Sequence, residues 1–225
     1  MFFKYFDLLL ALFVLVLLVS NVVSAKILKS GPFTFDGGTI LFPLAYILGD
    51  VFTEVYGYKK MRRVIWLGFL ANILMAAIFI IVSKLPAAEG WNNQKAYEAI
   101  LGWVPRIVIA SIIAYWVGEF VNSFILAKMK IFTKGRFLWM RTISSTLVAE
   151  FLDSLIFCVI AFLGKVPSAL LFKIIISNYI FKVLIEILFT PITYWVANFL
   201  KKKEKIDTFD FQTNFSPFKI NDYHY

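Results

Sequence analysis

Long apolar runs separated by short polar segments dominate the chain. A helix needs about 20 mostly apolar residues to cross a bilayer. Six runs approach or exceed that length: Leu8–Ala25, Thr39–Tyr56, Val64–Val82, Val104–Leu126, Leu138–Leu163 and Ala169–Leu200. The last run is longer than one crossing requires, and its membrane part is expected near Ile174–Phe199 with some tilt. The pattern predicts an all-α, polytopic membrane protein with six transmembrane helices.

Composition agrees with this pattern. Of the 225 residues, 60% are apolar and 18% are aromatic. Such a composition excludes a soluble globular domain and places the chain in a lipid bilayer. We expect a single six-span domain over residues 1–200 and a cytoplasmic tail over residues 201–225, which is too short for a soluble domain.

The distribution of Lys and Arg predicts the orientation. In a six-span arrangement, fourteen of these residues fall on one side, five fall on the other, and four lie within or at the edges of spans. Because basic loops are retained on the cytoplasmic side, both termini are predicted to be cytoplasmic. The same asymmetry accounts for the formal charge of +9, so a nucleic-acid-binding surface is not needed to explain it.

The first run has a second interpretation. A short basic start, an apolar stretch from Leu8 to Val19 and the small-residue ending Val23-Ser24-Ala25 also describe a signal peptide. Against that interpretation, Asn21 and Lys26 are not followed by a polar mature domain. We therefore favour a first transmembrane span and keep the signal peptide as the alternative.

Cysteine and histidine contribute little chemistry. Cys158 and His224 are the only residues of their types. Cys158 lies in mid-span, where a small apolar core residue is the simplest interpretation. Neither an intramolecular disulfide nor a His/Cys metal site is expected, and no cofactor is predicted.

Charged residues inside the apolar runs are the most informative feature. A charge at mid-bilayer costs roughly 3 kcal/mol on insertion scales, so several at one depth indicate a functional polar site. Residues four apart share a helix face. Asn178, Lys182 and Glu186 form such a stripe on the sixth span, and Thr142, Thr146, Glu150 and Asp153 form another on the fifth. Two polar stripes predict two helices that line a common cavity.

Polar groups also fall inside the second and fourth spans, at a similar expected depth. Asp50 and Glu54 lie one turn apart on the second span, and Glu119 and Asn122 lie on the fourth. The complete set of candidate substrate-binding residues is Asp50, Glu54, Glu119, Asn122, Arg141, Glu150, Asp153, Asn178, Lys182 and Glu186. The alternative is a purely structural ion pair of Lys182 with Glu186 or Asp153, which would leave the other acids without a cation.

The second run carries helix-breaking residues at its start. Gly37 and Gly38 precede it, and Pro43 lies in its first turns. One interpretation is an irregular backbone that lines a substrate site, as in transporters with broken helices. The other is a glycine turn followed by an early helical kink. Six spans would also divide into a 3+3 inverted repeat, for which the echo of Asn21 and Ala25-Lys26 by Asn122 and Ala127-Lys128 is a weak internal sign.

A set of short motifs, taken together by order and spacing, identifies a family resemblance. The motifs are Asp36-Gly37-Gly38-Thr39, Phe42-Pro43-Leu44, Asp50, Glu54-Val55-Tyr56-Gly57, Glu119, Asn122-Ser123, Arg141-Thr142 with Ser145-Thr146, Asp153-Ser154, Tyr179 with Phe181-Lys182-Val183, Pro191, and Asn214-Phe215-Ser216-Pro217-Phe218. Through nearly its whole length the chain resembles the queuosine precursor transporters, also called the vitamin uptake transporter family. The resemblance implies roles most directly for Asp50, Asp153 and Lys182, because the family is not always acidic at positions 150 and 186.

The resemblance implies an importer, in the bacterial inner membrane, of 7-deazaguanine bases used to make the tRNA nucleoside queuosine. The residues fit such a ligand. A guanine-type edge offers adjacent N–H donors to a carboxylate, and its carbonyl oxygen needs a donor such as Lys182 or Asn178. Phe42, Tyr46, Tyr115, Trp116 and Trp139 are candidates for stacking on the ring.

We therefore expect a secondary transporter with a nucleobase-like small-molecule substrate, embedded in lipid, with a homodimer as one assembly that the sequence allows. Within transport, the alternative is a substrate-binding membrane subunit that needs a separate ATP-driven partner. A membrane-embedded enzyme is the alternative from another class. It would need a nucleophile or a metal set, whereas the chain offers a group of carboxylates.

Overall fold

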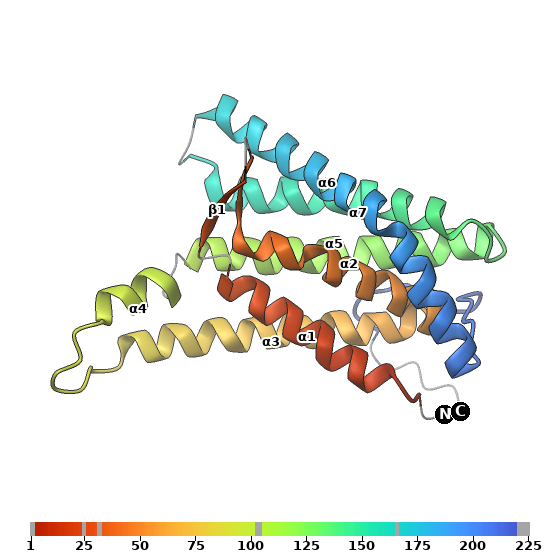
Figure 1. The fold of residues 1–225 in the computed structure, drawn as a ribbon, viewed down its shortest axis with the longest axis horizontal. Coiled ribbons are helices and arrows are strands. Elements are labelled where there is room, and N and C mark those ends of the chain that lie inside the picture. The colour runs from red at the N-terminus through yellow and green to blue at the C-terminus, as the bar shows by residue number, and fades with distance from the viewer. Residues whose placement is uncertain (1–2, 24–25, 31–32, 102–104, 165–166, 220–225) are drawn as a thin grey trace.

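The computed structural model describes residues 3–23, 26–30, 33–101, 105–164 and 167–219. Long helices run side by side along the longest dimension of the molecule, and a small β-hairpin lies near one end (Figure 1). The elements are α1 (Phe6–Val23), β1 (Ile27–Ser30), β2 (Phe33–Asp36), the 3₁₀-helix η1 (Gly37–Leu41), α2 (Phe42–Val51), the π-helix η2 (Phe52–Tyr56), α3 (Tyr58–Lys84), α4 (Gln94–Leu101), α5 (Pro105–Phe132), α6 (Leu138–Phe162) and α7 (Ser168–Glu204). The expected helical class is confirmed, with one short hairpin added.

Five helices within the described residues are long and apolar enough to cross a membrane. They are Phe6–Val23, Tyr58–Lys84, Ile109–Phe132, Leu138–Ala161 and Ile174–Glu204. Each corresponds to one of the expected runs, although Ala25 and Val104, at the ends of two runs, lie outside the described residues. The protein is therefore a multi-pass membrane protein.

The second expected run is a composite of three helix types. Gly37 begins η1, and Pro43 lies in the first turn of α2, where its missing N–H costs no intrahelical hydrogen bond. The last turn widens into the π-helix η2, and Gly57, with φ of +83°, ends it. Gly37 therefore begins a 3₁₀-helix and not a turn, and the run has non-α backbone at both ends, in η1 and in η2.

The first and last long helices meet at one end of the bundle. The backbone N–H of Tyr5 donates to Glu204 Oε1 at 2.7 Å, and the Tyr56 hydroxyl donates to the same oxygen at 3.2 Å. At the opposite end, the Gly37 N–H donates to the Lys26 carbonyl at 2.8 Å. The composite segment η1–α2–η2 therefore runs the length of the bundle.

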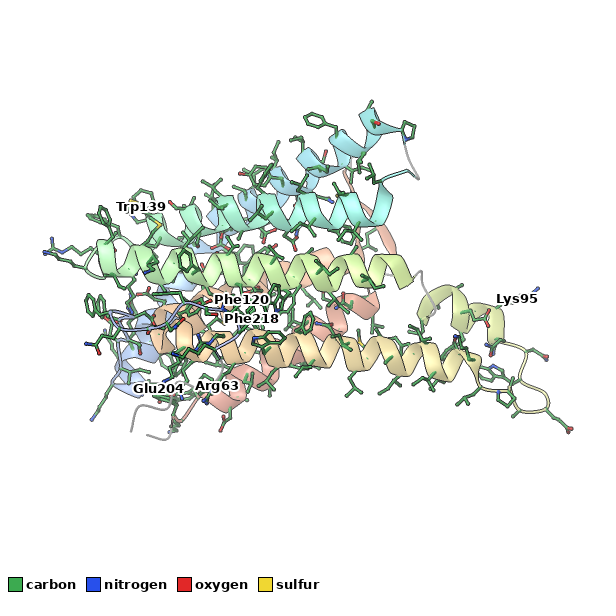
Figure 2. The ribbon with its side chains drawn as sticks, turned by 180° about the vertical axis from the view of Figure 1, so that it is seen from behind. Arg63, Lys95, Phe120, Trp139, Glu204 and Phe218 are labelled. Carbon is green, nitrogen blue, oxygen red and sulfur yellow. The ribbon has the colours of Figure 1, made fainter. Side chains whose placement is uncertain are left out.

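Charged side chains mark the two ends. Arg63 and Glu204 lie at one end and Lys95 lies at the other (Figure 2).

Between the ends, α1, α3 and α5 are linked by polar contacts. Asn21 Nδ2 donates to Asn72 Oδ1 at 2.6 Å, and the Ser111 hydroxyl donates to Asn21 Oδ1 at 3.3 Å. Side-chain amides and hydroxyls that bond across helices are typical of helix association in membranes.

The chain beyond residue 200 continues α7 to Glu204 and then folds back over α3 and α5. We call residues 206–219 the C-terminal strap. The buried Arg62 Nη1 donates to the carbonyls of Asn214 and Ser216 at 2.7 and 2.8 Å, and Trp66 Nε1 donates to the Pro217 carbonyl at 2.9 Å. Phe218 packs against Trp66 and Trp116, with ring centroids 6.2 and 5.8 Å apart. The segment expected as a tail is therefore part of the packed structure.

Candidate functional site

Three charged side chains meet where α6 and α7 pack together. Lys182 of α7 bonds with Asp153 of α6, and its Nζ lies 2.9 Å from Glu150 Oε2, one turn earlier on α6. The side chains are 11%, 18% and 7% exposed for Lys182, Asp153 and Glu150, respectively. The Tyr46 hydroxyl of α2 lies beside the Glu150 carboxylate. We call Lys182, Glu150 and Asp153 the Lys182 cluster. It unites the two polar stripes that the sequence predicts, and it holds one cation between two acids.

A second set of acids lies next to the Lys182 cluster. Asn122 Nδ2 of α5 donates to Asp50 Oδ1 of α2 at 2.7 Å. A Cβ atom on Gly49 would lie 3.2 Å from Glu119 Oε2, so Glu119 rests against α2 beside Asp50. Glu186 of α7 faces Asp50 and Glu150. We call Asp50, Glu119 and Glu186 the acidic group.

Each member of the acidic group has a buried carboxylate oxygen without a hydrogen-bond partner within the described part of the chain. These atoms are Asp50 Oδ2, Glu119 Oε2 and Glu186 Oε1. Asp50 and Glu186 are each only 1% exposed. A buried charge without a partner is costly, so these three oxygens require a proton, a ligand or a cation in the working protein.

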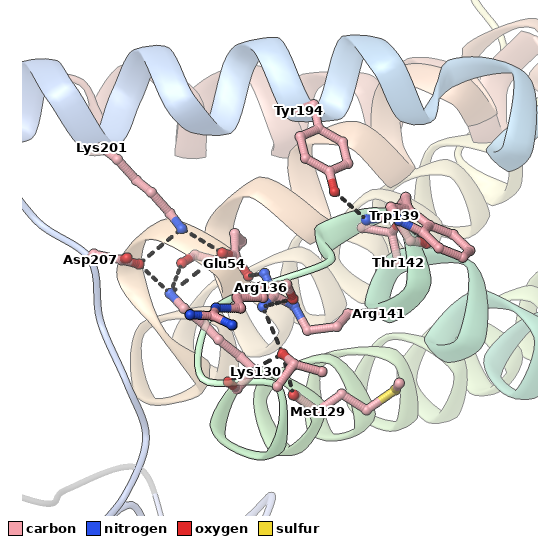
Figure 3. Close-up of polar contacts among 11 residues, drawn as sticks. Glu54, Met129, Lys130, Arg136, Trp139, Arg141, Thr142, Tyr194, Lys201 and Asp207 are labelled. Carbon is pink, nitrogen blue, oxygen red and sulfur yellow. Dashed lines mark hydrogen bonds and ion pairs between the residues drawn. The ribbon is translucent and has the colours of Figure 1, made fainter.

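A separate ion-pair cluster surrounds Glu54, which is fully buried (Figure 3). Arg141 Nη2 lies 2.8 Å from Glu54 Oε2, and Lys201 Nζ lies 2.5 Å from Glu54 Oε1. Lys130 Nζ donates to the Glu54 backbone carbonyl at 2.5 Å. Asp207 of the strap bridges the two lysines, with Oδ1 at 2.5 Å from Lys130 Nζ and 2.9 Å from Lys201 Nζ. We call these five residues the Glu54 cluster.

The Glu54 cluster joins η2, α5, α6, α7 and the strap. Glu54 and Arg141 were expected in the substrate site, but they contact each other here and not the Lys182 cluster. Lys130 and Lys201 were not identified from the sequence, because Lys and Arg near span ends were used only as signals of orientation. Asp207 was not identified, because that residue lies in the segment expected as a tail. No feature of the sequence marks these lysines as partners of a buried glutamate.

The π-helix explains why Asp50 and Glu54 have different partners. On a regular α-helix, residues four apart lie on one face. The π-helix η2 begins at Phe52, between the two acids, and its wider turn rotates the residues that follow. Asp50 therefore faces Asn122, whereas Glu54 faces Arg141 and Lys201.

The remaining candidates fall in several places. Asn178 Nδ2 lies 3.9 Å from Cys158 Sγ, at the α6–α7 contact. Among the stacking candidates, Trp116 packs on Phe218 at 5.8 Å between ring centroids, which makes it a packing residue of the strap. The side chain of Phe42 lies outside the described part of the structure. Within the described residues, no group of three or more His, Cys, Asp and Glu side chains is arranged to hold a metal ion.

Long apolar helices around a charged centre define the class as a polytopic membrane transport protein. A family model described as "Putative vitamin uptake transporter" matches residues 36–196, and the chain belongs to this family. The resemblance seen in the sequence is confirmed.

Curated relatives agree with the family match. The chain is 28% identical to a "Probable queuosine precursor transporter" of Bacillus subtilis (strain 168), over 75% of this chain and 74% of that protein. It is 28% identical to a "Queuosine precursor transporter" of Escherichia coli (strain K12), over 74% of each chain. No solved structure matches. These relatives and the family are named as transporters, so the expectation of a transporter and not an enzyme is confirmed.

Proposed function

We propose that the chain is a secondary transporter that imports queuosine precursors, namely 7-deazaguanine bases, across the bacterial inner membrane. The observation that carries the proposal is the Lys182 cluster, a buried cation shared by two carboxylates at the contact of two transmembrane helices. The names of the relatives supply the substrate class.

The chemistry of the Lys182 cluster suits a guanine-type edge. A lysine ammonium has three donors, so Lys182 can release one bond and donate to the carbonyl oxygen of the base. Asp153 accepts from adjacent N–H groups of the same edge, as ionised carboxylates do. Tyr46 lies beside Glu150 and offers a ring next to the bound base.

The proposed topology has six crossings, with the substrate site near the middle of the membrane. The composite segment η1–α2–η2 serves as the second crossing and adds to the five helices described above. An even number of crossings returns the chain to its starting side, in agreement with the contact of Tyr5 with Glu204. The basic residues gathered at that end favour a cytoplasmic location for both termini. Three crossings on either side of α4 would form the two halves of an inverted repeat. The proposed assembly in lipid is a homodimer.

Competition for uptake tests the substrate. Cells unable to make the precursor and expressing the chain are given a labelled 7-deazaguanine, with unlabelled 7-deazaguanine or 7-deazaadenine as competitor. The adenine pattern replaces the carbonyl by an amino donor and removes the N1 hydrogen. Each buried group left unsatisfied costs about 1–3 kcal/mol. Two mismatches therefore predict competition weaker by roughly a hundredfold or more, at about 1.4 kcal/mol per factor of ten.

Cells that carry the empty vector provide the background for this measurement. Equal competition by the two bases would contradict the proposed reading of the guanine-type edge. It would mean that the site recognises a flat aromatic ring by stacking and shape, and the carboxylates would then serve another purpose.

A further inference from the structure

We propose that Asp50 and Glu119 form a proton-binding pair, separate from the Lys182 cluster, and that this proton is carried inward with the substrate. The coupling part of this inference rests on the proposed function, whereas proton binding itself does not. The ligand is a proton that forms an O–H bond on one carboxylate when the pair faces the outside and leaves it when the pair faces the cytoplasm.

The charge balance of the site motivates the pair. Five carboxylates, those of Asp50, Glu119, Glu150, Asp153 and Glu186, lie near one another. Two of them, Glu150 and Asp153, bind the ammonium of Lys182. Arg141, which faces Asp50, pairs with Glu54 at 2.8 Å. Like charges in a water-poor site cannot all ionise, so the acids outside the Lys182 cluster are the ones that hold a proton.

The geometry places Asp50 and Glu119 together for this role. Glu119 and Asn122 lie one turn apart on α5, and both face α2. Asn122 donates to one oxygen of Asp50 at 2.7 Å, which leaves Asp50 Oδ2 buried without a partner within the described residues. Gly49 has no side chain, and Glu119 Oε2 occupies the space 3.2 Å from where its Cβ would stand. A protonated carboxyl gains an O–H donor, so one proton lets the pair share a hydrogen bond that two carboxylates cannot make.

Several titratable or charged side chains face Asp50 and Glu119. The titratable and charged groups that face it are Glu54 of η2, Tyr46 of α2, Tyr115 of α5, Arg141, Glu150 and Asp153 of α6, and Glu186 of α7. Most of these neighbours are acidic, which favours the protonated form of the pair. Arg141, the cation that faces Asp50, is already bound by Glu54.

Infrared difference spectroscopy tests proton binding without any substrate. Purified full-length protein in lipid is titrated between acidic and alkaline pH. The wild type should show the C=O band of a protonated carboxyl that disappears on deprotonation, and Glu119→Gln should lose this band. Glu119→Asp keeps a titratable carboxyl and should retain it, with a shifted midpoint. Glu98→Gln, on the exposed face of α4, is the matched control and should keep the wild-type band. A band that persists in Glu119→Gln and in Asp50→Asn would overturn the proton site.

Transport by reconstituted vesicles tests the coupling. A gradient of one pH unit, acidic outside, is worth about 1.4 kcal/mol and predicts about tenfold accumulation of a 7-deazaguanine if one proton accompanies each molecule. A protonophore should abolish this accumulation. Glu119→Gln should be recovered in the vesicles in the wild-type amount but should accumulate none, whereas Glu119→Asp, which keeps the carboxyl, and Glu98→Gln should both accumulate the base.

The remaining outcomes separate the two proposals. Accumulation driven by a sodium gradient, or unchanged in Glu119→Gln, would overturn the coupling. A Glu119→Gln variant that loses affinity for an aminomethyl-bearing base but not for an uncharged one would show that the acids bind a cation on the substrate, which also overturns it. If the wild type exchanges no 7-deazaguanine while the infrared band behaves as expected, the substrate proposal fails and the proton site stands.

Discussion

Lys182 is held by two carboxylates from the neighbouring helix, and this arrangement differs from a simple neutralising pair. A single acid would balance its charge, yet both Glu150 and Asp153 contact its ammonium. The second acid makes the cluster net negative. Such a cluster keeps Lys182 charged in a water-poor site and leaves acceptor capacity for a ligand that brings N–H donors.

Substitution at Lys182 and Asp153 tests whether this cluster is functional. Lys182→Met and Asp153→Asn should each abolish uptake of a 7-deazaguanine while membrane insertion remains, because each removes a charge and leaves its partner uncompensated. Uptake and the amount of inserted protein are measured together, with the exposed Lys95→Met and Asp7→Asn as controls. Near-normal uptake by both variants would contradict the proposed role, and poor insertion of both would favour a structural pair.

The Glu54 carboxylate should contribute more to stability than Asp207 of the strap does. Glu54 is fully buried between cations, so Glu54→Gln should lower the free energy of unfolding by about 3–5 kcal/mol. Asp207 is 45% exposed, and Asp207→Asn should cost at most about 1 kcal/mol. Unfolding in detergent, followed by circular dichroism, compares the two variants. A larger loss in Asp207→Asn would contradict this ranking.

Asp207 also links strap stability to pH. Burial acts to raise the pKa of the Asp207 carboxyl, but hydrogen bonds and the charges of Lys130 and Lys201 outweigh it and hold the pKa below its usual value. Because the folded-state pKa is lowered, this stabilisation is fully present above the usual pKa of aspartate. It is lost as the pH falls through the lowered value.

Among the elements, the join of η2 and α3 is tightly constrained. Gly57 there has φ of +83°, and a Cβ atom on it would lie 2.6 Å from Thr208 Cγ2 of the strap. Next to it, the Tyr58 N–H donates to Asp210 Oδ2 at 3.0 Å. The strap therefore locks the end of the composite segment by both shape and hydrogen bonding.

A pair of glycine substitutions compares this crowded position with an open one. Gly90 has φ of +82° but nothing within 4 Å of its Cβ position, so Gly90→Ala measures the backbone penalty alone. That penalty is of the order of 1–2 kcal/mol. Gly57 combines φ of +83° with ψ of 164°, a region essentially confined to glycine, and its Cβ would also clash with the strap. Gly57→Ala should therefore lower the unfolding midpoint clearly more than Gly90→Ala does, and equal shifts would contradict this prediction.

The long elements were predictable from the sequence, and their local departures were not. Apolar runs fix the five long helices because length and hydrophobicity suffice to place a helix in a bilayer. The π-helix η2 has no such signal, since a widened turn has the same length and hydrophobicity as a regular one. The ion-pair partners of the charged side chains could not be predicted from the sequence either. The helical stripes placed Glu150, Asp153 and Lys182 on facing sides, but they could not show that Lys130 and Lys201 turn inward.

At the scale of the whole molecule, the two ends of the bundle differ in chemistry. The end with Glu204 holds the Glu54 cluster, the strap and the ends of α1 and α7. The other end holds the β-hairpin and the exposed helix α4. On the end with Glu204, four elements and the strap converge on one buried glutamate. In the proposed transporter this end faces the cytoplasm, and the ion pairs of the Glu54 cluster hold its helices together.

The orientation of these ends is the most direct test of the whole arrangement. A reporter fused after Lys205 should be active only as a cytoplasmic reporter, because the positively charged end is expected inside. A reporter inserted near Asn93, between α3 and α4, should be active only outside. The opposite pattern would reverse the orientation, and two reporters on one side would mean that α5, α6 and α7 do not all cross the membrane. The intact mass adds an independent check, since a mature chain that begins at Lys26 would mean that the first run is a cleaved signal peptide. The carrier would then have five crossings, and its C-terminus would face the side opposite to its new N-terminus.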